Sequence, residues 1–328
     1  MKRIVLSTTL ALAAFTPFAV RGQDLPENPN RFSFGPRFGM NFKADFYNNV
    51  NPGPAAGGAG HTYNDGYVLV DSSGDAGGLT WNWGYQKSFQ VVGDTMQFHA
   101  IQPGGSSSAT GNPQYGLELT YQRVLGPLPF LSSVRWGLEA GFGYTDLDLR
   151  NNRSGTVPVT TDTFPLNGVL PPGAGYNGTF QGPGALLGDT PTRTTTSATL
   201  TSNQKLSGQM FSIRLGPFAE WNFTPKLSLA ASVGLTLAPT TVNYDFSETV
   251  SLAGGGTFEA SGHSSKTELL YGPYVSGMLR YDFTKSWGVY VGAQFQSLTD
   301  LEQSIGSRTA RLDPGATVYV TVGASWRF

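Results

Sequence analysis

Few side chains in this 328-residue chain could do acid–base or nucleophilic chemistry. There is no cysteine and there are only three histidines, so thiol nucleophiles, zinc–thiolate sites and disulfides are excluded. His263 is followed by Ser264, Ser265 and Glu268, which are the residue types of a serine activated by an oriented histidine. They lie at the end of a glycine-rich stretch, where we expect a solvated loop rather than a buried triad.

The other candidates for chemistry are single residues or incomplete motifs. His99 lies beside Gln97 in a frame that would face a polar interior. Gly173 to Gly178 fits G-x-G-x-x-G, but that motif binds dinucleotides only between a strand and a helix, and neither is expected here. Asp146 and Asp148 form an acidic pair without an Asp-x-His partner. We therefore predict no catalytic residues, no cofactor and no metal, and a protein that is not an enzyme.

Composition narrows the class of protein further. Charged residues make up 13% of the chain, against roughly 25% in a typical soluble domain. The net charge of −1 provides no field for binding nucleic acid. After the first twenty or so residues no apolar run reaches the length of about 18 that a membrane helix needs.

The N-terminus has the pattern of a secretory signal. A basic start at Lys2 and Arg3 precedes an apolar, alanine-rich stretch from Ile4 to Val20, with small residues before Gln23. We expect residues 1–22 to be a signal peptide and residues 23–328 to be one domain.

Alternation with a period of two dominates the mature chain. From residue 211 to 222 every second residue, beginning with Phe211, is apolar, and the intervening positions include Ser212, Arg214 and Glu220. This is the pattern of a strand with two unlike faces. The apolar face lasts about 11 residues, the length that a tilted transmembrane strand needs. Similar windows lie at 32–42, 79–85, 95–101, 115–125, 134–144, 227–237, 271–283, 287–295 and 318–328.

The breaks between these windows alternate between short and long. Residues 223–226 and 283–286 are tight turns, whereas 47–78, 103–113, 150–204, 252–265 and 302–314 are long stretches rich in Gly, Pro, Ser and Thr. This order is typical of a closed, up-and-down antiparallel transmembrane β-barrel with short periplasmic turns and long extracellular loops. We expect about ten strands, with eight or twelve as the other possibilities.

Two sets of residues distinguish a membrane barrel from a soluble sandwich. Tryptophans in the apolar frame lie near predicted turns or the C-terminus, as an interfacial aromatic girdle requires: Trp136, Trp221, Trp287 and Trp326. The opposite face is rich in Gly and Ser and carries spaced charges, as a narrow lumen requires: Arg37, Glu118, Arg135, Glu139, Arg214, Glu220 and Arg280. These charges form either a salt-bridged plug, which we favour, or the lining of a narrow polar path.

The last residues resemble the C-terminal signal of bacterial outer-membrane barrels. Thr321, Gly323, Trp326 and Phe328 occupy its polar, glycine, hydrophobic and terminal aromatic positions. The mature chain is similar to the small single-domain outer-membrane barrels of the OmpA and OmpW types. The resemblance implies an outer-membrane location, recognition by the barrel-assembly machinery, and contact with outer-membrane lipids and lipopolysaccharide, to which the Asp146–Asp148 pair could bind through divalent cations.

Three functions follow as expectations. The first is a non-enzymatic barrel that displays long surface loops for envelope integrity or surface contact. The second is a small channel for hydrophobic or small polar solutes. The third is an outer-membrane lipid or peptide hydrolase, because the His263-Ser264-Ser265 stretch is similar to the His-x-Ser arrangement of outer-membrane lipid A deacylases.

Overall fold

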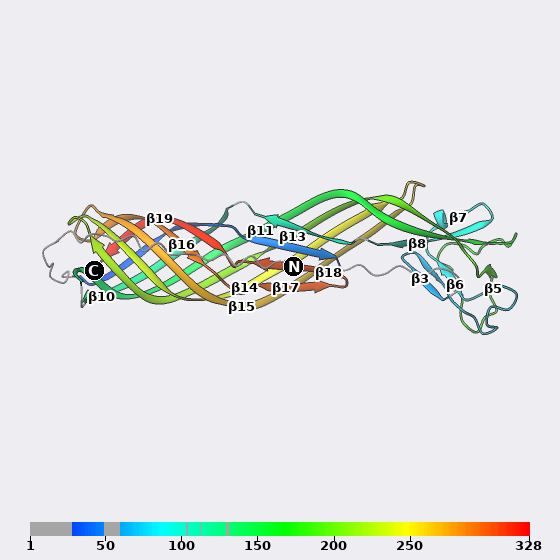
Figure 1. The fold of residues 1–328 in the computed structure, drawn as a ribbon, viewed down its shortest axis with the longest axis horizontal. Helices are drawn as coiled ribbons and strands as arrows, with labels where there is room; N and C mark the ends of the chain where they lie inside the picture. Colours follow the sequence, from blue (N-terminus) through cyan, green and yellow to red (C-terminus); the bar gives the residue numbers. More distant parts are fainter. Residues whose placement is uncertain (1–27, 49–59, 103, 112, 129–130) are drawn as a thin grey trace.

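The computed structural model describes residues 28–48, 60–102, 104–111, 113–128 and 131–328. The predicted signal peptide, residues 1–22, lies outside this part of the chain. Among the described residues no helix is long and apolar enough to cross a membrane. The molecule is elongated, with a closed ring of strands at one end and a small head at the other (Figure 1).

Eight strands form the closed ring. They are β1 (Asn30–Met40), β10 (Gln114–Leu128), β11 (Leu131–Pro165), β13 (Thr192–Asn222), β14 (Leu227–Ser251), β15 (Thr257–Asp282), β16 (Trp287–Gln296) and β19 (Thr317–Arg327). All neighbouring strands pair antiparallel, and the ring closes because β1 pairs with both β10 and β19 while β10 also pairs with β11. The expected antiparallel barrel is confirmed. Its ring has eight strands, one of the two other possibilities, rather than about ten.

The two surplus windows explain the difference in strand count. Residues 79–85 give β5 (Leu79–Thr80) and β6 (Trp83–Tyr85), and residues 95–101 give β8 (Thr95–Ile101). β8 pairs with the far end of β11, and β6 lies in a separate small sheet, so neither strand belongs to the ring. In both windows apolar residues alternate with others because one face of the strand packs into the core of the head. Burial of one face gives the same period of two as contact with lipid.

A second level continues the ring away from the tight turns. Here β2 (Lys43–Asn48), β9 (Gly105–Thr110), β17 (Leu301–Ile305) and β18 (Arg308–Asp313) form a sheet in the order β17-β18-β2-β9. Each of them follows or precedes a ring strand in sequence, and they stand opposite the long extensions of β11, β13, β14 and β15. We call this level the upper storey. Its interior is an apolar core that includes Phe42, Leu149, Val242 and Leu312.

The chemistry of the two faces inverts between the ring and the upper storey. Along β13 the even-numbered residues point inward from Ala198 to Asn222. Most of them are polar or charged in the ring, as at Ser212 and Arg214, whereas Leu206 and Met210 directly above the ring are apolar. The odd-numbered residues show the converse change, from exposed Ile213 to polar residues above Phe211. The ring therefore has the arrangement of a barrel in lipid, and the upper storey that of a barrel in water.

The head contains short strands around a compact aromatic core. It comprises β3 (His61–Tyr63), β4 (Gly66–Val68), β5, β6, the 3-10 turn η1 (Ser88–Gln90), β7 (Val91–Val92), β8 and β12 (Leu187–Gly188). Trp83, Phe98 and Phe164 are buried at its centre. Fully buried aromatic residues outside the ring indicate an ordered unit rather than a flexible loop.

Much of the sequence expected to be loop is strand. β11 extends to Pro165, β13 begins at Thr192, and β15 begins at Thr257, so the stretches 150–204 and 252–265 are largely paired. Residues 302–314 form most of the β17–β18 hairpin. Their Thr- and Ser-rich composition suits a sheet with a solvated outer face, which composition alone does not distinguish from a loop.

Candidate functional site

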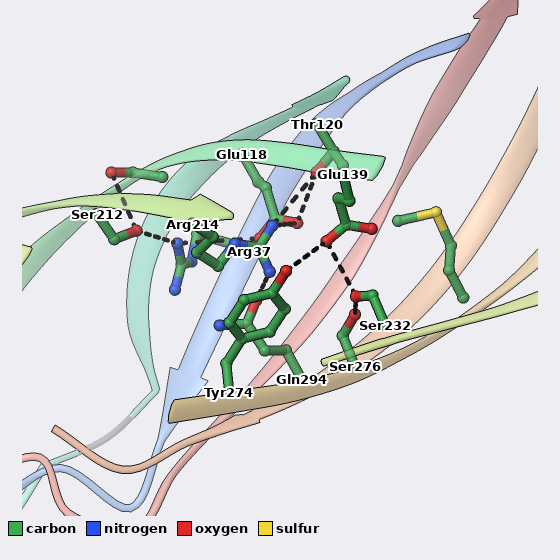
Figure 2. A network of polar contacts seen from close by, with 12 residues as sticks. Arg37, Glu118, Thr120, Glu139, Ser212, Arg214, Ser232, Tyr274, Ser276 and Gln294 are labelled. Atoms are coloured by element: carbon green, nitrogen blue, oxygen red, sulfur yellow. Dashed lines mark hydrogen bonds and ion pairs between the residues drawn. The ribbon is translucent and has the colours of Figure 1, made fainter. Parts of the chain in front are cut away.

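The ring encloses a network of buried charges that includes all seven of the predicted lumen residues. Arg37, Arg214 and Glu118 form its centre, from β1, β13 and β10 (Figure 2). Arg214 Nη2 donates to Glu118 Oε1 at 2.7 Å, and Arg37 Nη1 lies 3.9 Å from Glu118 Oε2. Three strands that are distant in sequence are therefore joined through one carboxylate.

Glu139 is held by neutral donors. Its carboxylate accepts from Ser232 Oγ at 3.0 Å and from Tyr274 OH at 3.3 Å (Figure 2). It also accepts from Gln122 Nε2 at 2.6 Å. Hydrogen bonds of this kind compensate a buried carboxylate for the water that it loses. Gln122, Ser232 and Tyr274 were not predicted, because uncharged lumen residues carry no distinct sequence signal.

A second ion-paired group lies nearer the tight turns. Arg280 Nη1 is 3.3 Å from Glu220 Oε1, and Asp282 pairs with Arg31 at 2.9 Å and Arg327 at 3.1 Å. Arg31, Asp282 and Arg327 were missed by the sequence analysis, although each lies in or beside a predicted strand.

Arg135 completes the predicted set. It is buried on β11 beside Asn222. With the Asn222 amide turned so that its oxygen faces the guanidinium, that oxygen accepts from Arg135 Nε at 3.2 Å.

The register between β13 and β14 is set by the turn that joins them. Phe223 N donates to Leu227 O, which centres the turn on Pro225. Arg214 consequently pairs with Thr236, and Glu220 pairs with Ala230.

Small residues make room for the arginines. A Cβ at Gly143 would lie 1.8 Å from Arg37 Nη1, and one at Gly141 would lie 2.7 Å from Arg214 Nη2. Arg37 also stacks on Tyr319, with its Cζ 3.5 Å from the ring centroid, a favourable cation–π contact. The glycines of the lumen face are thus matched to the bulky side chains opposite them.

The lumen is filled at this level. The cavity beside Glu118, Glu139 and Arg214 has a volume of about 10 Å³, room for about one water molecule. Above it the apolar core of the upper storey occupies the interior. This arrangement favours a plugged lumen over a narrow polar path.

The outside of the ring is apolar and ends in aromatic residues. Leu117, Ile213 and Leu235 are more than half exposed, an apolar surface far larger than single scattered residues would make. Trp287, Trp326 and Phe328 form a stacked row, with ring centroids 6.3 and 4.6 Å apart. Phe328 also stacks on Phe32 at 5.5 Å, where β19 closes against β1.

The other two tryptophans of the predicted girdle lie near the same turns. Trp136 is 36% exposed and faces Ala219, while Trp221 pairs with Val134. Trp221 also packs on Phe223, with centroids 5.1 Å apart.

Two histidines have positions that the sequence did not predict. His99 is in the head rather than the lumen, buried with Nδ1 2.6 Å from Asp65 Oδ2. His263 is exposed on the outer face of β15, with Nδ1 2.6 Å from Asp245 Oδ1. Glu268, the carboxylate that follows His263 in the sequence, pairs with Lys266 at 2.8 Å. No cluster of three or more His, Asp or Glu that could hold a metal occurs within the described ranges.

A third ion pair, whose carboxylate is fully buried, joins the head to the long strands β11 and β13. Asp162 of β11 accepts from Tyr63 OH at 2.7 Å and from Arg193 at 2.6 and 2.7 Å. Burial acts to raise the pKa of Asp162, but the hydrogen bonds from Arg193 and Tyr63 outweigh it and hold the pKa below its usual value. The same contacts raise the pKa of Arg193.

A ring with a polar interior, an apolar exterior and an aromatic rim is the architecture of an outer-membrane barrel. The chain resembles outer-membrane barrels of known structure. OprG of Pseudomonas aeruginosa is 10% identical over 93% of this chain and 99% of its own, with a TM-score of 0.34. Ail of Yersinia pestis is 10% identical over 91% and 99%, with a TM-score of 0.26. A FadL homologue of Pseudomonas aeruginosa is 10% identical over 92% of this chain and 90% of its own, with a TM-score of 0.18. No family model and no curated protein sequence matches the chain.

Proposed function

We propose that this chain is a non-enzymatic outer-membrane barrel whose plugged ring anchors a rigid stem and head for surface contact or envelope integrity. The observation that carries the proposal is the length of the paired strands. β13 has 31 residues, about 100 Å at roughly 3.3 Å per residue. The hydrocarbon core is about 30 Å thick. Only the part of β13 from Phe211 onward has an apolar outer face, so most of the strand stands in water.

The proposed orientation places the tight turns in the periplasm and the head outside the cell. Lipopolysaccharide would then surround the outer rim, where Asp146 and Asp148 follow Tyr144 on the outer face of β11. The barrel-assembly machinery would recognise the last strand through Thr321, Gly323, Trp326 and Phe328. An exported precursor with a cleaved signal peptide belongs to the same proposal.

The absence of native cysteine allows a direct test of orientation. Gly173→Cys introduces one thiol in the head, where a side chain meets no neighbouring atom within 4 Å, and Lys285→Cys introduces one at a tight turn. A membrane-impermeant maleimide should label the first variant in intact cells and the second only after the outer membrane is opened. Labelling of the Lys285→Cys variant alone in intact cells would reverse the proposed orientation.

The contact role is tested by disrupting the head while leaving the ring intact. Phe98→Ala with Phe164→Ala removes two rings from the buried head core, and should abolish surface attachment or envelope resistance conferred by the wild-type protein. The heat-dependent gel shift of the folded barrel should remain. If both phenotypes persist with a disordered head, the contact role is wrong.

One observation favours a lipid hydrolase as a second candidate. Asp245 on β14 orients His263 through Nδ1, and Ser265 lies two residues further along the same outward face of β15. This supplies the carboxylate that an activated serine needs. His263→Ala and Ser265→Ala should each abolish any change in lipopolysaccharide acylation that depends on this protein. If cells with and without the protein have identical lipopolysaccharide, this candidate is excluded.

A further inference from the structure

A positively charged hollow opens at the turn end of the ring. Its volume is about 520 Å³, and Lys226, Lys285, Arg327, Asp282 and Phe283 line it. We call it the base hollow. It lies outside the lumen network and is not explained by a stem that carries a head.

The two lysines are held on rigid turns. Thr224 Oγ1 accepts from Leu227 N at 2.9 Å in the first turn, and Thr284 Oγ1 accepts from Trp287 N at 2.8 Å in the second. Asp282 N donates to Lys226 O at 2.8 Å, which fixes the first turn beside the second. Two hairpins with the same Phe-Thr start thus place both lysines beside one hollow, with little backbone ordering left to do on binding.

The base hollow keeps a net positive charge after the ion pairs within it are formed. Asp282 is already compensated by Arg31 at 2.9 Å and Arg327 at 3.1 Å. Within the described part of the chain, neither Lys226 nor Lys285 has a carboxylate within 4.0 Å. Arg31 Nη1 is buried behind the hollow without a hydrogen-bond partner. The hollow therefore favours an anion.

The position of the base hollow indicates which anion it would meet. Phe283, which lines it, is 53% exposed on the outer side of the ring, and Trp287 and Trp326 stack close by on the same side. Aromatic girdles of this kind lie at the level of lipid headgroups. Lysine stems near a membrane boundary extend their charged ends toward that level.

We propose that the base hollow binds the phosphate of an anionic phospholipid, with Lys226 and Lys285 as its ligands and Phe283 against the upper acyl chain. This inference rests on the proposed insertion of the ring in a membrane. A zwitterionic lipid offers the same phosphate but brings a cation toward Arg327, so it binds more weakly. Free inorganic phosphate shares the chemistry but gains nothing from Phe283.

The test uses the full chain in nanodiscs of phosphatidylcholine with a small fraction of phosphatidylglycerol, followed by native mass spectrometry of retained lipid. Lys226→Ala with Lys285→Ala should lower phosphatidylglycerol affinity about thirtyfold, about 2 kcal/mol at about 1 kcal/mol per lysine near a lipid surface. Lys87→Ala with Lys205→Ala removes the same charge from the head, where Lys87 is exposed, and from the upper storey, where Lys205 is half-buried. This control variant should retain wild-type affinity.

The outcomes are distinguishable. A heat-dependent gel shift of every variant shows whether the ring has inserted, so a failed barrel is not mistaken for a failed site. Equal phosphatidylglycerol retention by the two double variants would overturn the proposal. Displacement of the lipid by millimolar inorganic phosphate would identify a free-phosphate site and overturn the lipid assignment.

Discussion

At the scale of single residues, Arg214 shows how strongly the lumen network depends on each of its members. Its side chain is buried, and Glu118 depends on it for the shorter of two ion pairs. Burying a charge without a partner costs more than the pair itself contributes. The individual members of this network are therefore much more sensitive to substitution than exposed charges are.

Arg214→Ala should destabilise the folded barrel by about 3–5 kcal/mol, because Glu118 is left buried with only the distant Arg37 as its cation. The midpoint of urea unfolding in lipid vesicles measures this loss. Arg150→Ala removes an exposed arginine that pairs with Asp148 at 2.8 Å and should leave the midpoint unchanged. Equal midpoints for wild type and Arg214→Ala would contradict the assigned role of the network.

Gly143→Ala should cost about 1–3 kcal/mol, because the new Cβ would occupy the place of Arg37 Nη1 and force that side chain to move. Gly155→Ala on the same strand meets no atom within 4 Å and is the matched control. If both variants unfold at the same urea concentration, the close fit between lumen glycines and arginines is wrong.

Asp162 makes the head sensitive to acid. Its folded-state pKa lies below that of the unfolded chain, about 3.9, so the carboxylate contributes stability that is present above about pH 4. This stability should be lost as the pH falls through the folded pKa. Hydrogen exchange of head amides, normalised to intrinsic rates at each pH, measures it. Asp162→Asn should weaken protection at neutral pH and remove most of the acid dependence.

At the scale of the element, β13 is one strand that serves two environments. The same inward parity holds from Ala198 to Asn222, while the solvent outside changes from water to lipid near Phe211. A strand can do this because its side chains alternate independently of what surrounds them. The alternation was predictable from the sequence.

Ile213→Lys should destabilise the inserted barrel by about 2–4 kcal/mol, because Ile213 is 51% exposed in the apolar belt and a charge there would face hydrocarbon. Thr199→Lys lies on the same outward face of β13, in the part that stands in water, and should have little effect. Urea midpoints in vesicles compare the two. A larger loss of stability for Thr199→Lys than for Ile213→Lys would contradict the proposed level of the membrane along β13.

At the scale of the whole molecule, the interior is filled at two successive levels, the lumen of the ring and the upper storey. Charged pairs fill the ring and apolar side chains fill the interior above it. Among the described residues, the cavity beside Glu118, Glu139 and Arg214 has a volume of only about 10 Å³. The length of the molecule is consequently better suited to holding a head away from the membrane than to conduction.

Purified protein should give no discrete conductance steps in planar bilayers, even at high protein load. The variant Arg37→Ala with Arg214→Ala leaves the upper storey intact and should also remain closed, because the apolar core lies above the removed side chains. Discrete steps from the wild-type protein would favour the channel alternative over the proposed stem and head.

The sequence by itself determined the antiparallel barrel, its lipid-facing residues and its charged lumen positions. These depend on the period of two, which any one strand displays locally. Trp136, Trp287 and Arg214, for example, could be assigned to a face without knowing their neighbours.

Only the tertiary structure decided the number of ring strands, the partners of each charge and the existence of the stem and head. An alternating strand looks the same whether its apolar face meets lipid or a protein core, so 95–101 could not be told from a ring strand. The pairing of His263 with Asp245 rather than Glu268, and of Asp162 with Arg193 and Tyr63, depends on register between strands. Register is a property of the closed sheet and is not present in any single stretch of the chain.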